Sequence, residues 1–492
     1  MRKILFTICI FCVTMTQAVA QNSYTSHEIK TGETLYSIAR TYGISVKDIQ
    51  TANPGLGDYY QIGQTILIPG KVEIPDCRTT YVVQKKETIY GISRKFGLTE
   101  EELLAANTLL KDGKLKKNTE LCIPYSQAQK DSIIALHRPK VIRPTEVNVG
   151  VVLPFGLNQE KKSKEAATMT DLYEGIMMAV QELKTKGLSI NIHAYDEDRI
   201  DDIFMNPEMK KMNVIIGPKD AFEITRMTRF CETNNIHLVI PLSSQETIVN
   251  GNKNVFQINT KIESRYARVF EQIGLHYPGY NIVYVNFPDG NNQYEFMSKH
   301  IGYLAQQHQG FLSVNLDNLT PAKQLLDEGK RVLIIPGSST VTAFEQLTDS
   351  LSAKGMASAN ITLFGYTDWQ AFASKYIDRF SRFNATFFTS FFNNPGTDAS
   401  MAFNQRFYDN FQRNQYNTYP RFGMLGYDIA NFFIKSIWEQ GNMFTSNLEQ
   451  LKSSSLQNPM HFTRKDAKSG FINTALMFVR YNGDGSISIK QF

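Results

Sequence analysis

The chain has 492 residues, a formal net charge of +5 and 42% hydrophobic residues. At about 100–200 residues per domain, this length implies several domains rather than one core. Loss of Arg2 and Lys3 with the amino-terminal segment would leave a charge of +3, without a polybasic stripe. This balance argues against nucleic acid as a partner.

Residues 1–20 have the pattern of a cleavable signal peptide. Arg2 and Lys3 form a positive start, and the mostly apolar run Ile4 to Ala20 follows. The run ends in Ala18-Val19-Ala20, a small-x-small triplet of the kind that signal peptidases recognise. It is shorter than the ~20 residues needed to span a bilayer. We therefore expect export with cleavage near Ala20 and no membrane-spanning segment.

The next hundred residues contain an internal repeat. A constant shift of 54 superimposes Thr34 on Thr88 and Asn53 on Asn107. After one inserted residue, Ile68-Pro69 aligns with Ile123-Pro124. We therefore expect two copies of one module, at residues 24–70 and 79–125.

Each copy is predicted to fold as a β-α-α-β unit. In the first copy, Thr34 is placed to cap the amino end of a helix, and Gly43 is suited to end it in a left-handed conformation. A second helix closes near Asn53, and a final apolar strand stops at Pro69, which cannot extend a ladder. The second copy repeats these features.

The run Gly32-Glu33-Thr34-Leu35-Tyr36-Ser37-Ile38-Ala39, the asparagine that follows it and the terminal Ile-Pro resemble the LysM module. The resemblance implies binding of N-acetylglucosamine-containing polymers such as peptidoglycan, in a groove between the loop after the first strand and the loop after the second helix. It also implies a periplasmic or secreted protein associated with the cell wall. By position it assigns glycan binding to Gly32, Glu33, Thr34, Leu35, Asn53, Pro54 and Gly55, and to Glu87, Thr88, Ile89, Asn107 and Thr108.

Two features bear on this assignment. Lys86 stands where the family has glycine, so we expect the first loop of the second copy to be reshaped and its affinity to be lower. For Thr34 and Asn53, helix capping and loop bracing are the alternative to sugar contact.

Three cysteines follow the expected signal peptide: Cys77, Cys122 and Cys231. Cys77 precedes the first strand of the second copy, and Cys122 lies in its last strand. Because these strands should pair side by side, we expect a Cys77–Cys122 disulfide, which would stabilise a unit too small to be robust alone. Cys231, beside Phe230 in an apolar helical stretch, is expected to be a core thiol.

Residues 126–146 are polar and contain two prolines, as is typical of a linker, and a short helix fits around 132–137. From residue 147 onward, short apolar strands alternate with amphipathic helices. Strands of this kind indicate a mostly parallel sheet covered on both faces. The expected strands are 147–154, 190–194, 214–216, 236–240, 282–285 and 332–335, with a helix at 171–184.

Several segments of residues 147–492, taken in order, resemble the type I periplasmic solute-binding proteins, the leucine/isoleucine/valine receptor class. They are Val151-Val152-Leu153-Pro154, Tyr173-Glu174-Gly175, Ile215-Ile216-Gly217-Pro218, Ile240-Pro241-Leu242-Ser243-Ser244 and Gly426-Tyr427-Asp428. The resemblance implies a multidomain chain in which two small α+β modules precede a two-lobed α/β domain with a cleft. By analogy, one lobe takes about 147–262 and 385–455, and the other takes about 265–380 and 456–492. A hairpin is expected around the turn at 481–485.

Ligands of such folds lie at the carboxyl ends of strands, where helix amino ends present N–H groups. The resemblance implies that Ser243 and Ser244 hold an amino-acid carboxylate, with capping of the next helix as the alternative. Asp368 is the candidate partner for the amine, and Gly426-Tyr427-Asp428 is expected to pack. The candidate cleft residues are Phe155, Pro218, Ser243, Ser244, Asp289, Tyr366 and Asp368.

Neither a catalytic nor a metal-binding pattern emerges from the sequence. The eight histidines lack metal-ligand spacing. The acidic run Asp196-Glu197-Asp198 with Asp201-Asp202 lacks the glycine of a calcium loop, and Pro207 stands in place of its closing glutamate. We interpret the run as a solvated loop that caps the next helix, and we expect no cofactor.

The sequence therefore predicts a non-catalytic peptidoglycan-binding envelope protein. Its receptor-like domain is expected to bind a small solute or amino acid, or to regulate cell-wall synthesis together with a synthesis or transporter partner. One alternative is a cell-wall hydrolase with an unrecognised site in the carboxy-terminal cleft. Another is the amino-acid-binding subunit of an ABC transporter.

Overall fold

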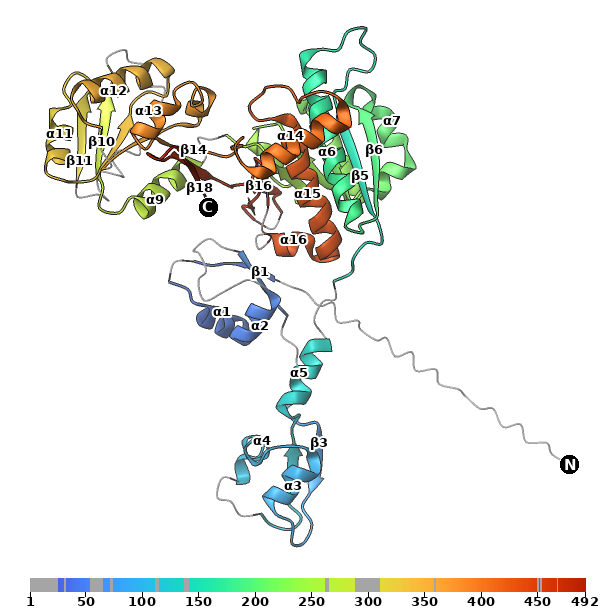
Figure 1. The fold of residues 1–492 in the computed structure, drawn as a ribbon. Coiled ribbons are helices and arrows are strands. Elements are labelled where there is room, and N and C mark those ends of the chain that lie inside the picture. The colour runs from blue at the N-terminus through green and yellow to red at the C-terminus, as the bar shows by residue number, and fades with distance from the viewer. Residues whose placement is uncertain are drawn as a thin grey trace. The chain divides into compact units, whose positions relative to one another are not determined.

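The computed structural model describes residues 25–30, 32–53, 65–70, 74–110, 115–136, 141–261, 265–287, 310–357, 360–448, 451, 454–466 and 468–492. The chain divides into two compact units, Met1–Val141 and Ile142–Phe492 (Figure 1). The expected signal peptide lies outside the described residues. None of the helices in the described ranges is both long enough and apolar enough to cross a membrane.

The first unit contains two modules with the expected β-α-α-β order. In each module the two strands pair antiparallel. The first module consists of β1 Thr25–Glu28, α1 Leu35–Tyr42, α2 Val46–Ala52 and β2 Thr65–Ile68. The second consists of β3 Thr79–Val82, α3 Ile89–Phe96, α4 Glu100–Ala106, η1 Thr108–Leu110 and β4 Glu120–Ile123.

Local sequence sets the helix ends of both modules. The side chains of Thr34 and Thr88 cap α1 and α3, and Gly43 and Gly97 end these helices with φ of 63° and 69°. These left-handed values are the ones at which glycine avoids a steric penalty. The apolar side of each helix pair then packs on its own two-stranded sheet, so each module has a separate small core.

The expected disulfide is confirmed: Cys77 and Cys122 are bonded, with their Cα atoms 5.3 Å apart. Helix α5, Gln127–Leu136, begins earlier than the helix expected in the linker. Its first turn is held by the second module, because Arg78 donates to Gln129 Oε1 at 3.0 Å and the Gln127 N–H donates to Glu102 Oε1 at 2.8 Å. The start of the linker is therefore structured.

The second unit contains two seven-stranded sheets, which we call lobe 1 and lobe 2. Lobe 1 has the strand order β15-β16-β9-β8-β7-β5-β6, with all neighbours parallel except the edge strand β15. Its strands are β5 Val147–Leu153, β6 Ile190–Asp196, β7 Val214–Ile216, β8 His237–Ile240, β9 Val255–Gln257, β15 Phe462–Thr463 and β16 Phe471–Asn473.

Lobe 2 has the order β11-β10-β12-β13-β14-β17-β18, in which the first five strands are parallel and the last two form the expected antiparallel hairpin. Its strands are β10 Asn281–Asn286, β11 Phe311–Asn315, β12 Val332–Pro336, β13 Ile361–Gly365, β14 Thr386–Thr389, β17 Met477–Tyr481 and β18 Ile487–Gln491. If the first five strands of each lobe are numbered in chain order, their order across the sheet is second, first, third, fourth, fifth in both lobes.

The expected lobe boundaries need two corrections. Strand β14, at 386–389, falls in the range expected for lobe 1 but pairs with β13 and β17 of lobe 2. Strands β15 and β16, at 462–473, fall in the range expected for lobe 2 but join β9 of lobe 1. The chain therefore changes lobe after β9, after β14 and after β16. Arg265 ties the first of these crossings to the third by donating to the carbonyl oxygens of Asn473 and Ala475, at 2.7 and 2.6 Å.

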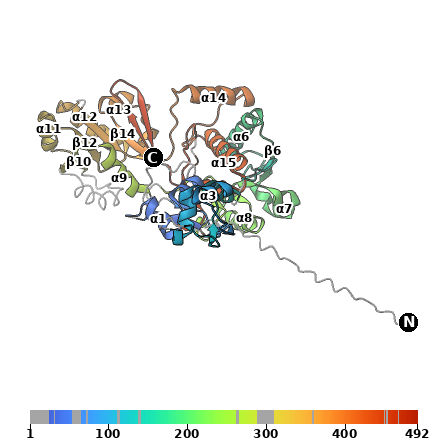
Figure 2. The same cartoon turned by 90° about the horizontal axis from the view of Figure 1, so that it is seen from below.

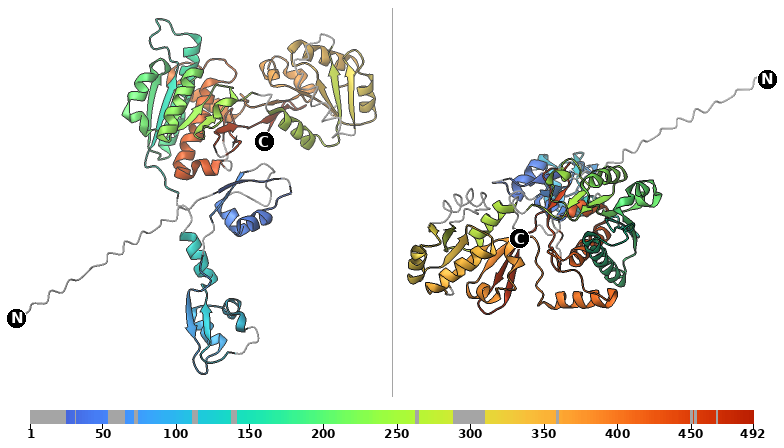
Figure 3. Two further views of the ribbon diagram at one scale, coloured as in Figure 1. Left: turned by 180° about the vertical axis from the view of Figure 1, so that it is seen from behind. Right: turned by 90° about the horizontal axis from the view of Figure 1, so that it is seen from above.

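Helices cover both faces of each sheet (Figures 1 and 3). In lobe 1, α6 Lys164–Thr185, α14 Asp398–Phe411, α15 Phe422–Gln440 and α16 Phe444–Asn447 pack on one face, and α7 Ile200–Met205 and α8 Ala221–Asn234 pack on the other. In lobe 2, α11 Thr320–Asp327, α12 Val341–Ala353 and α13 Ile377–Arg382 lie opposite α9 Tyr266–His276. Short 3-10 helices are η2 Glu197–Arg199, η3 Pro207–Lys211, η4 Glu246–Val249, η6 Thr367–Ala371 and η7 Gly441–Met443.

Helices α6 and α15 lie side by side in lobe 1 (Figure 2). A β-carbon on Gly426 would stand 1.9 Å from the carbonyl oxygen of Leu172, so glycine is required at this contact. Asp428 is buried and accepts backbone N–H bonds from Leu456, Gln457 and Asn458 at 2.7–2.9 Å. The segment Gly426-Tyr427-Asp428 therefore packs the fold, as expected.

Candidate functional site

The loop after β1 is held by the carboxylate of Glu33. Its Oε2 atom accepts from the Lys30 N–H at 2.8 Å and lies 2.8 Å from His27 Nε2. The backbone hydrogen bond from Lys30, together with the contact to His27, lowers the pKa of Glu33. Gly32 has a φ of 85°, and Thr34 Oγ1 accepts from the Ser37 N–H at 3.1 Å. The loop is therefore a turn fixed by its own side chains, directly before α1.

The loop after β3 has the same construction. Glu87 Oε2 accepts from the Gln84 N–H at 2.7 Å, and its Oε1 accepts from the Tyr81 hydroxyl at 2.7 Å. Thr88 Oγ1 accepts from the Gly91 N–H at 3.1 Å. Lys86 has a φ of 69°, so it adopts the left-handed conformation of Gly32. The expected reshaping of this loop is therefore wrong, because the lysine backbone accepts the turn that glycine favours.

The predicted contacts on the helices lie partly in the module cores. Leu35 is buried, and Ile89 is half-buried against the second core. These two side chains directly follow the loops and pack in or against the module cores. Thr34 and Thr88 cap their helices, as the alternative interpretation has it, and both stay exposed beside the loops.

The asparagine at the end of the second helix of each module binds the backbone, and in the second module it also braces the loop after α4. Asn107 Nδ2 donates to the carbonyl oxygens of Leu103 and Cys122 at 2.8 and 2.7 Å, and its Oδ1 accepts from the Cys122 N–H at 2.8 Å. Asn53 is fully buried and donates to the Ile49 carbonyl at 2.7 Å. These contacts show loop bracing for Asn107, whereas the bond from the Asn53 side chain to Ile49 closes the end of α2. Thr108 is exposed, whereas Pro54 and Gly55 lie outside the described residues.

In the second unit, strand order reverses between β5 and β7 in lobe 1 and between β10 and β12 in lobe 2. Ligands of open α/β sheets bind at the carboxyl ends of strands at such points. Phe155 and Pro218 follow β5 and β7, so both predicted residues lie at the switch point of lobe 1. Phe155 is buried, and its ring packs edge-on against Tyr173 with centroids 5.6 Å apart.

The first two residues of the acidic run at 196–202 organise this edge and are buried. Asp196 is buried and accepts from the N–H groups of Phe155 and Leu157, at 3.2 and 2.7 Å. Glu197, also buried, accepts from the N–H groups of Lys219 and Asp220, at 2.7 and 2.8 Å. Burial raises the pKa of Glu197, although these hydrogen bonds oppose the shift. The expectation of a solvated loop is therefore wrong for Asp196 and Glu197, whereas Asp198, Asp201 and Asp202 are exposed. The expected capping is confirmed, because the Asp196 side chain accepts from the Asp198 N–H at the start of η2.

Ser243 and Ser244 follow β8 at the same edge. The residue that precedes η4 is Gln245, whose side chain makes no capping bond, so neither serine caps that helix. Ser243 Oγ accepts from the Gln245 N–H at 3.3 Å, and the Ser243 carbonyl accepts from Gln257 Nε2 at 2.9 Å. The capping alternative is therefore wrong, and the carboxylate role remains a prediction.

At the edge of lobe 2, Tyr366 is buried and its hydroxyl donates to the Pro336 carbonyl, so this side chain is part of the core. Asp368 is exposed and accepts from Ser339 Oγ at 2.8 Å. Ser338 and Ser339, both buried after β12, were not predicted from the sequence. Their position after Pro336 mirrors Ser243-Ser244 after Pro241, which is the signal that could have found them. Asp289 lies outside the described residues.

Cys231 is a free, fully buried cysteine in α8, as expected, and burial raises the pKa of its thiol. Within the described ranges, no three His, Cys, Asp or Glu side chains come together to hold a metal ion.

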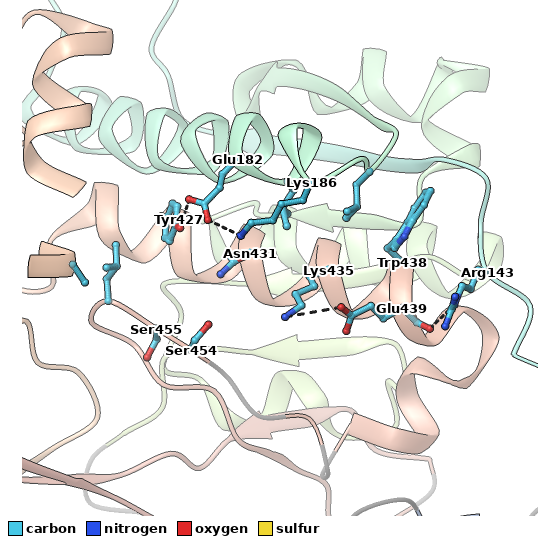
Figure 4. Close-up of a pocket in the computed structure, with 14 residues that line it drawn as sticks. Arg143, Glu182, Lys186, Tyr427, Asn431, Lys435, Trp438, Glu439, Ser454 and Ser455 are labelled. Carbon is cyan, nitrogen blue, oxygen red and sulfur yellow. Dashed lines mark hydrogen bonds and ion pairs between the residues drawn. The ribbon is translucent and has the colours of Figure 1, made fainter. Parts of the chain in front are cut away.

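A pocket of about 510 Å³ lies on the α6 and α15 side of lobe 1, away from the predicted residues (Figure 4). Glu182 on its wall accepts from Lys186, Tyr427 and Arg406 at 2.7–3.0 Å. Burial opposes ionisation of Glu182, but these three donors outweigh it and lower its pKa to about 2. The rest of the lining includes Arg143, Asn431, Lys435, Trp438, Ser454 and Ser455.

Comparison with known proteins identifies the amino-terminal modules. The family model described as LysM domain matches residues 27–69 and 81–124. Over 93 residues the chain is 31% identical to a probable peptidoglycan endopeptidase, LytE, of Bacillus subtilis, and over 117 residues it is 27% identical to an N-acetylmuramoyl-L-alanine amidase, sle1, of Staphylococcus saprophyticus. These matches cover 18% and 22% of this chain, but 28% and 35% of the length of those relatives. The catalytic activities in the names of these relatives are therefore not shown for this chain.

Solved structures similar to this chain include a putative branched-chain amino acid ABC transporter protein from Rhodospirillum rubrum, at 12% identity and a TM-score of 0.48. Another is a branched-chain amino acid transporter periplasmic ligand-binding protein from Burkholderia xenovorans, at 14% identity and a TM-score of 0.43. Each match covers 70% of this chain, with 100% and 95% of the other chain. The chain carries two LysM domains, at residues 27–69 and 81–124, followed by an α/β domain with two sheets.

Proposed function

We propose that this protein is a non-catalytic, peptidoglycan-binding component of the cell envelope. Its LysM domains bind the amino-sugar chain, and its two-lobed domain acts as a receptor for a small solute or as a regulator of cell-wall synthesis. The proposed glycan contacts are the loops at 32–34 and 86–88, with the loops that follow Asn53 and Asn107.

The observation that carries the proposal is the duplicated turn before α1 and α3. In both LysM domains a glutamate accepts the N–H of the residue three positions before it, at 2.8 and 2.7 Å. The turn residue has a positive φ in both. Because these bonds fix the backbone without a ligand, little conformational entropy is lost when a sugar chain binds. Two such loops on one chain also raise avidity for a repetitive polymer.

The non-catalytic assignment of the second unit rests on how its candidate reactive groups are used. The thiol of Cys231 is buried, and the carboxylates of Asp196 and Glu197 are occupied by backbone N–H groups. Groups held in this way stabilise loops and are not poised for proton or acyl transfer.

Isothermal titration tests the proposal. An N-acetylglucosamine hexamer added to the full chain is expected to bind with a stoichiometry near two, and a glucose hexamer without acetamido groups is the control. Absence of heat with the amino-sugar oligomer would refute glycan binding. Separate titrations with branched-chain amino acids address the transport-subunit alternative, and release of soluble fragments from purified cell wall would contradict the non-catalytic assignment.

A further inference from the structure

We propose that the pocket between α6, α15 and the segment 454–456 binds a short carboxylate-bearing peptide, of the kind attached to the glycan of peptidoglycan. The identification of peptidoglycan as the source of the peptide rests on the function proposed above. The chemistry of the site rests on the pocket alone.

Several hydrogen-bond donors around this pocket have no partner within the described part of the chain. Around this pocket, the side chains of Asn431, Trp438, Ser454 and Ser455 make no hydrogen bond to any part of the chain that the structure describes. Ser454 is exposed and the other three are partly exposed, so these donors are available at the cavity to a ligand that accepts hydrogen bonds.

The cations of the pocket are also incompletely paired. Lys435 has a single carboxylate contact among the described residues, at 3.9 Å from Glu439. Arg143 Nε donates to the Glu439 carbonyl oxygen at 3.0 Å. Its two terminal nitrogens make no hydrogen bond to the described part of the chain. Figure 4 shows the side chains of Arg143 and Lys435 on either side of the Trp438 segment of α15. A guanidinium and an ammonium with free donors favour carboxylate as the ligand group.

Of the two carboxylates in the pocket lining, Glu182 is well satisfied, and Glu439 has the Lys435 contact at 3.9 Å as its ion pair among the described residues. Glu182 has three donors, from Lys186, Tyr427 and Arg406, and these hold it ionised. The lining therefore carries three cationic side chains against two carboxylates and is positive overall: Arg143, Lys186 and Lys435 face Glu182 and Glu439. The partly buried ring of Trp438 adds a flat apolar wall that suits a methyl-bearing peptide or a sugar ring. The volume of about 510 Å³ lies within the range of small-ligand pockets, about 300–1,000 Å³.

Chain connectivity links the pocket to the glycan. Arg143 is the second residue of the second unit, so the pocket lies where the chain arrives from the LysM domains. The pocket and the LysM domains therefore belong to one chain and can bind two groups of one polymer. Tethering raises the effective concentration of a second group on the same polymer, so a modest intrinsic affinity suffices.

Tryptophan fluorescence of the full chain tests this proposal. The chain has two tryptophans, of which Trp369 is fully buried in lobe 2 and Trp438 lines the pocket. A soluble disaccharide-tetrapeptide is expected to give a saturable change in emission that persists in Trp369→Phe and disappears in Trp438→Phe. Further arms use the disaccharide without peptide and the free tetrapeptide.

Charge reversal supplies the matched comparison. Lys435→Glu is expected to weaken the response at least about tenfold. Lys210→Glu makes the same change at an exposed lysine of lobe 1 outside the pocket, and should bind within twofold of the parent chain. Thermal unfolding of each variant checks that lobe 1 remains folded.

Equal affinity in Lys435→Glu, or a response that needs no peptide, would overturn the site. Binding of the free tetrapeptide but not of the sugar-linked form would overturn peptidoglycan as the source. These outcomes are separable from failure of the LysM proposal: loss of binding to the N-acetylglucosamine hexamer with a retained Trp438 response would refute that proposal and leave this pocket intact.

Discussion

The backbone of Gly175 in α6 and that of Gly423 in α15 approach so closely that a β-carbon on Gly175 would stand 1.8 Å from the Gly423 carbonyl oxygen. That distance is far inside van der Waals contact, and the obstructing atom belongs to the backbone and cannot turn away. Gly175→Ala is therefore expected to destabilise the second unit by about 3 kcal/mol, or to prevent it from folding. Urea unfolding followed by circular dichroism measures the loss.

Gly396→Ala is the matched control for this prediction. A β-carbon there would lie 3.5 Å from Asn394 Oδ1, an ordinary contact, so the change should stay within about 0.5 kcal/mol. Equal effects of the two substitutions would show that the helix contact does not need glycine.

Asn107 offers a test of bracing against sugar contact. Asn107→Ala removes three hydrogen bonds and leaves the backbone groups of Leu103 and Cys122 without their side-chain partner. We expect a loss of about 2–3 kcal/mol in the stability of the second LysM domain. Thr108→Ala, at the exposed next position, should be nearly neutral for stability. Unchanged stability in Asn107→Ala together with weaker glycan binding would instead support direct sugar contact.

Lys86 carries a conformational cost that glycine would avoid. A left-handed conformation costs a non-glycine residue about 1–2 kcal/mol, and the greater chain entropy of glycine offsets part of this gain. Lys86→Gly is therefore expected to stabilise the second LysM domain by about 1 kcal/mol or less, measured by thermal unfolding. Gly32→Ala should destabilise the first domain by a similar amount. A lower melting temperature for Lys86→Gly would contradict this account.

His237 makes the stability of lobe 1 depend on pH. Its ring packs edge-on against Phe256 and Phe444, at centroid distances of 5.5 and 5.2 Å, and burial lowers its pKa from 6.5 to about 4. The unfolded chain therefore binds a proton below pH 6.5 that the folded chain binds only near pH 4, so the contribution of His237 to stability falls as pH falls through this window. At pH 5 this loss amounts to about 2 kcal/mol relative to pH 7.

His237→Phe removes the titrating group and preserves the aromatic packing. The variant should lose less stability than the parent chain between pH 7 and pH 5, as read from urea midpoints at the two pH values. Parallel pH dependence in the two proteins would show that the imidazole is not the source.

Much of the architecture follows from local sequence. The repeat of Thr34 at Thr88 and of Gly43 at Gly97 predicts both LysM domains, because capping and left-handed turns depend on a few neighbouring residues. The apolar runs at 147–153 and 214–216 likewise predict β5 and β7. The Cys77–Cys122 bond followed from the pairing of β3 with β4.

Features that depend on tertiary contacts could not be predicted from the sequence. The placement of β14 and β16 depends on where the chain crosses between sheets, and their short apolar runs fit either lobe. The loop bracing by Asp196 and Glu197 depends on backbone N–H groups far along the chain. The pocket joins Arg143, Asn431 and Ser454, whose spacing carries no signal, although Asn431, Lys435 and Glu439 repeat every four residues along one side of α15.

The central claim is that the paired LysM domains hold this protein on peptidoglycan. The most direct measurement is co-sedimentation of the purified full chain with insoluble murein sacculi, with cellulose as a polymer that lacks amino sugars. We predict that the protein pellets with sacculi, stays in solution with cellulose and is released by soluble N-acetylglucosamine oligomers. Protein that remains wholly in the supernatant with sacculi would contradict the claim.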